Sequence, residues 1–195
     1  MSGMGPKKIG VLALQGDFEA HKRALARAGA DAVEVRSAAD LETVDGLVIP
    51  GGESTTMWKL LEAEGLLGPL REFGREHPIF GTCAGAILVA TEVSNPPQSS
   101  LGLVDIGVER NAYGRQLDSR VARIEPQGLE GGIEAVFIRA PIIRRVGREA
   151  RVLARYQGDP VLVEQGRHMV ATFHPELTAD SRVHRMFLDK VGPVN

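Results

Sequence analysis

The sequence predicts a single three-layer α/β domain, in which helices cover both faces of a mixed, mostly parallel sheet. Two observations indicate this fold. Short apolar runs alternate with helical patterns through the first half of the chain, a rhythm typical of parallel strands joined by crossover helices. The runs are apolar without interruption, as expected for strands buried on both faces. We expect this domain to span residues 9–191, after a flexible tail at residues 1–8.

The first half of the chain contains the elements of this pattern in turn. Residues 9–14 (IGVLAL) predict a strand, and residues 17–28 predict a helix that Gly29 ends. Three more apolar runs predict strands, at residues 32–35, 47–49 and 79–80. Three more helical patterns follow these strands, at residues 55–64, 67–76 and 84–91. Since ligands bind beyond the carboxyl ends of parallel strands, the glycine clusters at 51–52 and 81–85 mark the candidate site.

The second half of the chain has a stronger β character. After a loop at residues 95–100, six short runs separated by turn residues predict strands, at residues 104–110, 120–124, 135–139, 152–156, 161–164 and 168–173. Some of them should pair as antiparallel hairpins that extend the sheet. Residues 181–191 predict a closing helix, with Ser181 as its N-cap.

The composition argues against several classes of function. The chain has 195 residues and a net charge of −2, and its charges of both signs are interspersed, which does not favour binding to nucleic acid. Its apolar runs are too short for a membrane span or a signal peptide. The single cysteine leaves no disulfide framework and no multi-cysteine metal site, and fits a reducing compartment. We therefore expect a cytoplasmic protein that needs neither a metal nor an organic cofactor.

That single cysteine, Cys83, stands between Gly81 and Gly85, where the predicted strand at 79–80 gives way to a helix. A sharp turn of this kind lifts a side chain above the sheet and needs small residues two positions to either side. The N–H groups of the following helix favour a thiolate, and the Ala84 N–H can help to hold an oxyanion. A small buried core cysteine is the alternative. The flanking glycines favour a nucleophile.

A thiolate nucleophile needs a base, and His174 is the best placed of the five histidines. It ends the predicted strand at 168–173 and is followed by proline, which keeps it extended. Residues two apart in extended backbone face the same side, so Glu176 can bond one imidazole nitrogen while the other faces the sulfur. His21 and His184 lie in the first and last predicted helices, where we expect surface or packing roles.

The Gly-x-Cys-x-Gly turn and the later His-Pro-Glu together resemble the class I, or triad, glutamine amidotransferases. Longer stretches narrow the resemblance to PdxT-type glutaminase subunits of two-component pyridoxal 5'-phosphate synthase. These stretches are GVLALQGDFEAH (10–21), PGGESTTMWKL (50–60), GTCAGAILVA (81–90), ERNAYGRQLDS (109–119), FIRAP (137–141) and ATFHPEL (171–177). The resemblance covers nearly the whole chain and implies the flavodoxin-like fold of class I glutamine amidotransferases.

The resemblance implies hydrolysis of L-glutamine to L-glutamate and ammonia. It makes Cys83 the nucleophile and assigns His174 and Glu176 to the rest of a catalytic triad. The ammonia would pass to a barrel-type synthase subunit (PdxS type) in a hetero-oligomeric complex, where pyridoxal 5'-phosphate is made for vitamin B6 biosynthesis.

The resemblance also implies a glutamine site, formed by Gly51, Gly52, Glu53, Arg110, Ile138 and Arg139. The chemistry of these residues agrees, because an arginine suits the α-carboxylate of glutamine and Glu53 can accept from its α-ammonium. Glycines let backbone N–H groups approach the amide oxygen without a Cβ in the way. We expect the Gly52 and Ala84 N–H groups to form the oxyanion hole.

Three other functions stay open on the sequence alone. A glutaminase that supplies another acceptor, such as imidazole glycerol phosphate synthase, would share the triad and the fold. A cysteine peptidase or deglycase of the flavodoxin-like type also uses a cysteine turn, but it does not require a distant His-Pro-Glu. A non-catalytic module could retain an inert cysteine, although the intact triad spacing argues against it.

Overall fold

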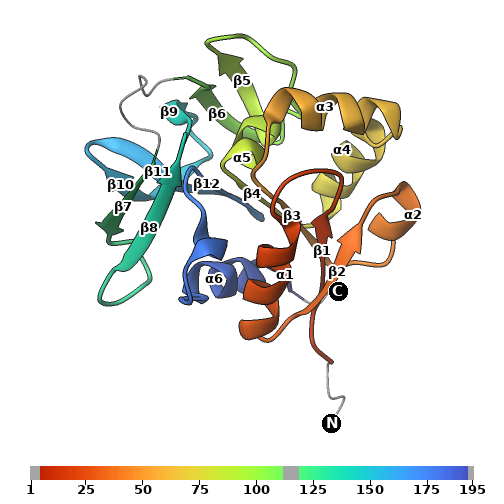
Figure 1. Ribbon diagram of the computed structural model, residues 1–195, viewed down its shortest axis with the longest axis horizontal. Coiled ribbons are helices and arrows are strands. Elements are labelled where there is room, and N and C mark those ends of the chain that lie inside the picture. Colours follow the sequence, from red (N-terminus) through yellow and green to blue (C-terminus); the bar gives the residue numbers. More distant parts are fainter. Residues whose placement is uncertain (1–4, 112–118, 193–195) are drawn as a thin grey trace.

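A seven-stranded sheet forms the centre of the chain, of which this computed structural model describes residues 5–111 and 119–192 (Figure 1). Its strands, in their order across the sheet, are β10 (Arg151–Tyr156), β11 (Asp159–Gln165), β12 (His168–Ala171), β4 (Ile79–Thr82), β3 (Gly46–Ile49), β1 (Lys8–Leu12) and β2 (Asp31–Val35). The strands from β12 to β2 are all parallel. The hairpins β10–β11 and β11–β12 are antiparallel and extend the sheet, which confirms that part of the prediction.

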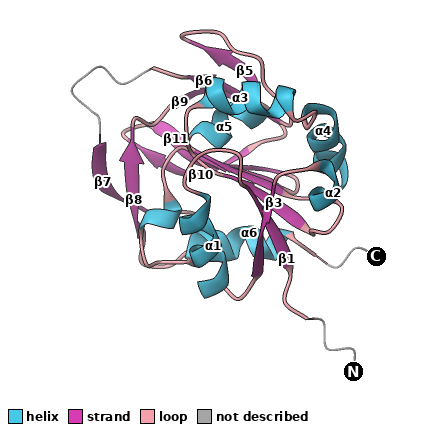
Figure 2. Cartoon of the chain, turned by 45° about the vertical axis from the view of Figure 1, so that its right-hand side comes forward, coloured by secondary structure: helices cyan, strands magenta, loops and turns pink. Residues whose placement is uncertain are grey.

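Helices cover both faces of this sheet, so the domain has the three predicted layers (Figures 1 and 2). One face carries α1 (Phe18–Arg27) and α6 (Arg182–Lys190). The other carries α2 (Ala38–Leu41), α3 (Ser54–Ala63), α4 (Leu67–Glu76) and α5 (Ala84–Val89). Successive strand side chains alternate between the two cores: Val48 joins the α1 side, while Leu47 and Ile49 join the other.

Two smaller sheets flank the central one. The first contains β5 (Ala90–Ser94), β6 (Val104–Glu109) and β9 (Ile142–Val146), and the second is the hairpin of β7 (Ser119–Ile124) and β8 (Ile133–Ile138). The sequence did not predict β5, β9 or the short helix α2. The predicted helix at 84–91 ends at Val89 because Ala90 pairs with Val104 of β6, a contact between distant segments.

The chain begins its first strand inside the segment that the sequence assigns to a tail. Lys8 is the first residue of β1 and pairs with Asp31 of β2. The Asp31 N–H also donates to the Lys7 carbonyl at 2.9 Å. Backbone pairing with β2 therefore orders residues 7 and 8.

The N-terminus of α6 is capped differently from the prediction. Ser181 occupies the predicted N-cap position, but its side chain makes no capping hydrogen bond. The Asp180 carboxylate accepts from the Arg182 N–H at 3.0 Å instead. The Arg182 guanidinium holds the same carboxylate, which fixes it over the helix start.

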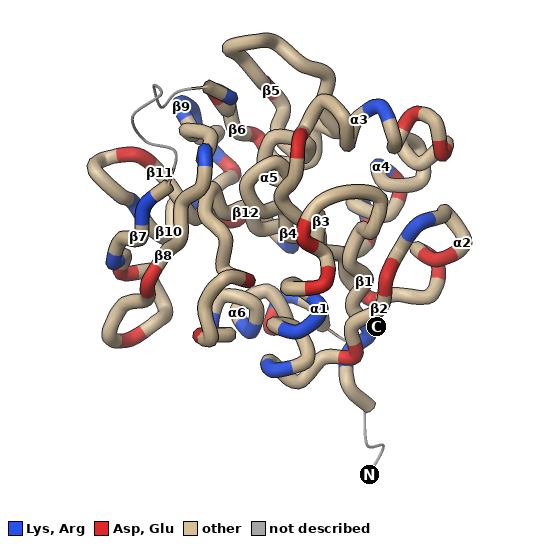
Figure 3. The backbone as a smooth tube through the Cα atoms, viewed as in Figure 1, with Lys and Arg blue, Asp and Glu red and all other residues tan. Residues whose placement is uncertain are grey.

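Charged residues of both signs are spread over the helices and loops (Figure 3). Within the described part of the chain, each helix is too short or too polar to cross a bilayer.

His168 joins the start of β12 to β4 and α4. Its Nδ1 accepts from the Ile79 N–H at 3.1 Å, and its ring also bonds to the backbone of Gly74. Burial lowers the pKa of His168 to about 4, so the imidazole is neutral at physiological pH. A neutral ring can accept at one nitrogen and donate at the other, as both contacts require.

We expect His168→Ala to lower the free energy of unfolding by about 3 kcal/mol at pH 7.5, because it leaves a cavity and an unpaired Ile79 N–H. The folded-state pKa lies below the unfolded value of 6.5, so the unfolded chain binds the proton first as the pH falls. The difference in free energy of unfolding between the wild type and His168→Ala should therefore be about 2 kcal/mol smaller at pH 5 than at pH 7.5. Urea unfolding of both proteins at both pH values measures this; a gap independent of pH would contradict it.

Candidate active site

The order of the strands brings the predicted site segments together. Cys83 follows β4, whose neighbours are β12 on one side and β3 on the other. His174 lies beyond the end of β12, and Gly51 lies beyond the end of β3. Because these strands are parallel, their carboxyl ends share one edge of the sheet.

The predicted tight turn is present at Cys83. Its backbone has φ 51° and ψ −109°, a conformation that non-glycine residues rarely adopt. The glycines on either side allow close packing, since a Cβ on Gly85 would lie 2.0 Å from the Ile49 carbonyl oxygen. A Cβ on Gly81 would lie 2.5 Å from the Gly85 carbonyl oxygen. No larger side chain fits at either position without moving the backbone.

His174 contacts the other two members of the predicted triad. Its Nδ1 lies 2.6 Å from Oε1 of Glu176, and its ring also hydrogen-bonds with Cys83. Burial opposes the charged imidazole, but the bonds to Cys83 and Glu176 outweigh it and raise the pKa of His174 to about 10. The ring is therefore an imidazolium at neutral pH, next to the sulfur and with a proton to donate.

Gly51 lies directly against this group of residues. A Cβ on Gly51 would be 2.8 Å from Cε1 of His174 and 3.3 Å from Cβ of Cys83. On another side, the Cys83 sulfur lies 3.8 Å from the carbonyl oxygen of Ile138, at the end of β8. Arg139 follows with φ 45° and an exposed side chain. The structure thus brings Gly51 and the Ile138 carbonyl to the cysteine.

Of the two expected oxyanion donors, Ala84 belongs to the cysteine turn and Gly52 follows Gly51, which lies against that turn. Ala84 follows Cys83 as the first residue of α5, where backbone N–H groups have no partner within the helix. Gly52 is exposed at the end of the β3 loop. A Cβ on Gly52 would lie 2.6 Å from Oε1 of Gln15, so this loop also needs glycine there.

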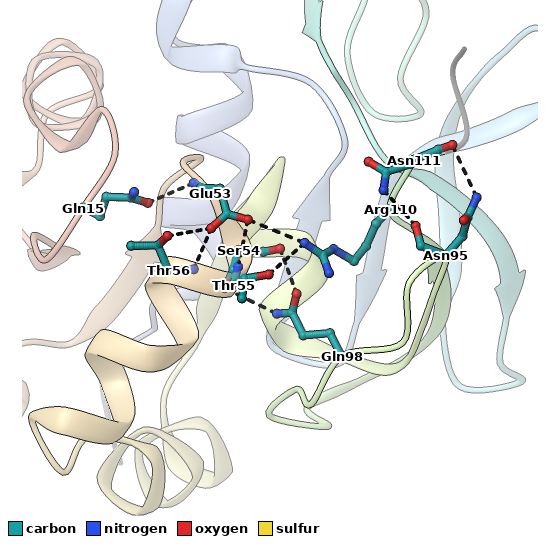
Figure 4. Close-up of polar contacts among 9 residues, drawn as sticks. All are labelled: Gln15, Glu53, Ser54, Thr55, Thr56, Asn95, Gln98, Arg110 and Asn111. Atoms are coloured by element: carbon teal, nitrogen blue, oxygen red, sulfur yellow. Dashed lines mark hydrogen bonds and ion pairs between the residues drawn. The ribbon is translucent and has the colours of Figure 1, made fainter. Parts of the chain in front are cut away.

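Glu53 and Arg110 lie side by side, as Figure 4 shows. Arg110 extends from the end of β6, and its Nη2 lies 2.9 Å from Oγ1 of Thr55 and 3.5 Å from Oε1 of Glu53. The Glu53 carboxylate also caps α3, because it accepts from the backbone N–H groups of Thr55 and Thr56. Hydrogen bonds from Thr56, chiefly from its hydroxyl, lower the pKa of Glu53.

Sequence reasoning missed two polar residues beside the site. The Gln15 side chain accepts from the Glu53 N–H at 2.9 Å and so connects the loop after β1 to the loop after β3, which contains Gly51 and Gly52 (Figure 4). His21 is fully buried and lies 3.3 Å from Oε2 of Glu176. The sequence signal that could have indicated this burial is the position of His21 on the apolar side of the predicted first helix. Among the described residues no cluster of His, Cys, Asp and Glu is arranged to hold a metal ion.

Comparison with known proteins decides the family. Residues 11–192 match the SNO glutamine amidotransferase family. The chain belongs to this family. Membership in the SNO family confirms the predicted class of enzyme, a glutamine amidotransferase.

Individual SNO-family relatives match over almost their full lengths. The "Pyridoxal 5'-phosphate synthase subunit PdxT" of Solibacter usitatus is 62% identical, and the alignment covers 95% of this chain and 100% of the relative. The protein of the same name from Koribacter versatilis is 55% identical, with 94% and 95% covered. A crystal structure described as a glutamine amidotransferase has 49% identity and a TM-score of 0.89, with 94% and 98% covered. These matches confirm the predicted resemblance and fold.

We expect Glu176→Gln to lower the pKa of His174 from about 10 by about one to two pH units, because an amide does not stabilise the imidazolium as a carboxylate does. Titration of the His174 ring resonances by NMR, assigned with His174→Asn, measures the change. Glu64→Gln, which alters an exposed carboxylate at the end of α3, is the matched control and should leave the titration unchanged. An unaltered titration in Glu176→Gln would show that the Glu176 carboxylate does not raise the pKa of His174.

Proposed function

We propose that this SNO-family chain hydrolyses L-glutamine to L-glutamate and ammonia with Cys83, His174 and Glu176 as a catalytic triad. The observation that carries the proposal is the contact of one imidazole with both the cysteine and the carboxylate, beyond the ends of β4 and β12. A nucleophile, a base and a group that orients the base are the parts that such a reaction needs.

The reaction would proceed through a covalent intermediate. The Cys83 thiolate attacks the side-chain amide carbon of glutamine, and backbone N–H groups stabilise the resulting oxyanion. His174 then gives its proton to the departing nitrogen, which leaves as ammonia and a γ-glutamyl thioester remains. In the second half, His174 takes a proton from water, which attacks the thioester and releases glutamate. Glu176 keeps the imidazole oriented and stabilises its charged form throughout.

The same geometry suits the rest of the substrate. Ala84, which follows Cys83, and Gly52, which follows Gly51, are the proposed oxyanion donors. Arg110 would bind the α-carboxylate of glutamine, and Glu53 would accept from its α-ammonium. Gly51 and the Ile138–Arg139 segment would line the side-chain amide, because Gly51 and the Ile138 carbonyl already lie against Cys83.

The proposal for which enzyme receives the ammonia rests on the names of the relatives. Both PdxT proteins described above are named as subunits of pyridoxal 5'-phosphate synthase, which favours this acceptor over that of another amidotransferase. We propose that the chain assembles with a barrel-type synthase subunit of the PdxS type and passes ammonia to it. The cytoplasmic location expected from the sequence stays a prediction.

We expect Cys83→Ser and His174→Asn each to lower glutaminase turnover by roughly 10³-fold or more, since each removes a group that takes part in bond making. Release of glutamate, measured with the synthase subunit present, is the assay. A glutamine-mimicking electrophile should label the wild type at Cys83, which is the only cysteine, and mass spectrometry locates the label.

His168→Ala serves as the control for this comparison, because it removes a buried histidine at the opposite end of β12. The folded control should keep its turnover. A wild-type rate in Cys83→Ser would refute the proposed nucleophile, and one in His174→Asn would assign the base elsewhere.

We further expect weak glutaminase activity from the chain alone and about tenfold or greater stimulation by a PdxS-type subunit. If ammonia passes directly between subunits, glutamine labelled with ¹⁵N in its amide should label the pyridoxal 5'-phosphate formed, even in excess unlabelled ammonium. Full activity of the isolated chain would contradict the stimulation, and dilution of the label by ammonium would contradict direct transfer.

A further inference from the structure

The carboxylate of Glu176 is buried, and only one of its oxygens has a regular hydrogen-bond partner. Oε1 lies 2.6 Å from Nδ1 of His174. Oε2 is shielded from solvent and accepts no hydrogen bond within the described part of the chain. Nε2 of His21 lies 3.3 Å from Oε2. A buried carboxylate oxygen without a donor is costly, so this contact is significant.

His21 contacts two separate segments of the candidate site, the end of β4 and the Glu176 carboxylate. It lies on α1 with no exposed surface, and its Nε2 is also 3.1 Å from Oγ1 of Thr82, the residue before Cys83. Its Nδ1 lies 2.9 Å from Nε2 of His184, on α6. One side chain thus contacts the strand that leads to the nucleophile and the carboxylate of the triad.

The contacts select one proton arrangement. Burial, together with the neighbouring His184 and His174, lowers the pKa of His21 well below its usual value, and burial lowers that of His184 to about 3, so both rings are neutral. Among the described residues, Nδ1 of His184 has no hydrogen-bond partner. An unpaired acceptor nitrogen costs less than an unpaired buried N–H, so the His184 proton belongs on Nε2. That proton is donated to Nδ1 of His21, which leaves the His21 proton on Nε2, where Oγ1 of Thr82 lies 3.1 Å away and Oε2 of Glu176 lies 3.3 Å away.

We propose that His21 is a positioning residue, whose Nε2–H holds Oε2 of Glu176 so that Oε1 stays directed at His174. This inference rests on the proposed triad. A carboxylate held at one oxygen can rotate about its last bond, whereas one held at both cannot. His21 contacts Thr82 at the same nitrogen, so it also fixes the carboxylate relative to the strand that ends at Cys83.

The proton arrangement can be measured without any activity. Two-bond ¹⁵N–¹H correlation spectra of the folded chain distinguish a protonated ring nitrogen from a bare one. We expect His21 and His184 both to carry their protons on Nε2. A His21 with its proton on Nδ1 would overturn the proposal, and this result would stand whether or not the chain is a glutaminase.

Kinetics then test the role in catalysis. His21→Met keeps the volume of the side chain but removes the donor, and we expect about tenfold lower kcat. KM should stay within twofold, because His21 is fully buried and does not face the substrate. His21→Gln places an amide N–H where Nε2–H was and should restore most of the loss. In the Glu176→Gln background, His21→Met should have no further effect, since both changes act on one group.

Equal loss in His21→Met and His21→Gln would indicate a packing role and overturn the proposal. Additive losses in the Glu176→Gln background would do the same, as would an unchanged kcat in His21→Met. His168→Ala is the matched buried-histidine control, expected to be less stable but to keep its kcat. Absence of glutaminase activity in the wild type would refute the proposed function instead, and the spectra would still decide the proton on His21.

Discussion

The pairing of β12 with β4 is the constraint on which the candidate site depends. The pairing continues past the last residue of β4, because the Cys83 N–H donates to the Ala171 carbonyl at 2.9 Å. This bond fixes the cysteine relative to the strand that leads to His174. It also helps to hold a backbone conformation that costs about 1–3 kcal/mol in a residue other than glycine. The proposed nucleophile and its proposed base are therefore aligned by the same ladder of backbone hydrogen bonds that forms the sheet.

The features that the sequence predicted correctly are local ones. Gly81 flanks the cysteine because a Cβ there would meet the Gly85 carbonyl within the turn itself, so this part of the pattern could be read without knowing the fold. A Cβ on Gly85 would instead meet the Ile49 carbonyl at the end of β3. The contact between His174 and Glu176 joins residues two apart, and the sequence predicted it from an extended backbone. The contact is present, but Pro175–Leu177 form a short 3₁₀ helix, so the predicted backbone conformation was wrong. The alternation of buried strands and helices in the first half also follows from local periodicity.

The features that the sequence did not predict depend on distant contacts. No pattern within β12 indicates that it lies beside β4 rather than at an edge, and β5 is a strand only because β6 pairs with it. His21 and His184 are far apart in the chain, so their contact could not be read from either helix. Glu53 was expected to bind a ligand, and its second role, as the cap of α3, becomes visible only with the helix start in place.

The short distance between Glu53 and Arg110 limits which small molecules can bind beside both side chains. The two side chains lie 3.5 Å apart, one negative and one positive. A simple anion attracted by the guanidinium also meets the repulsion of the carboxylate, and a simple cation meets the reverse. A small zwitterion, with its opposite charges one atom apart on the same carbon, can satisfy both partners at once. In the proposed glutamine site, the pair would therefore select a ligand by its pattern of charges rather than by its net charge.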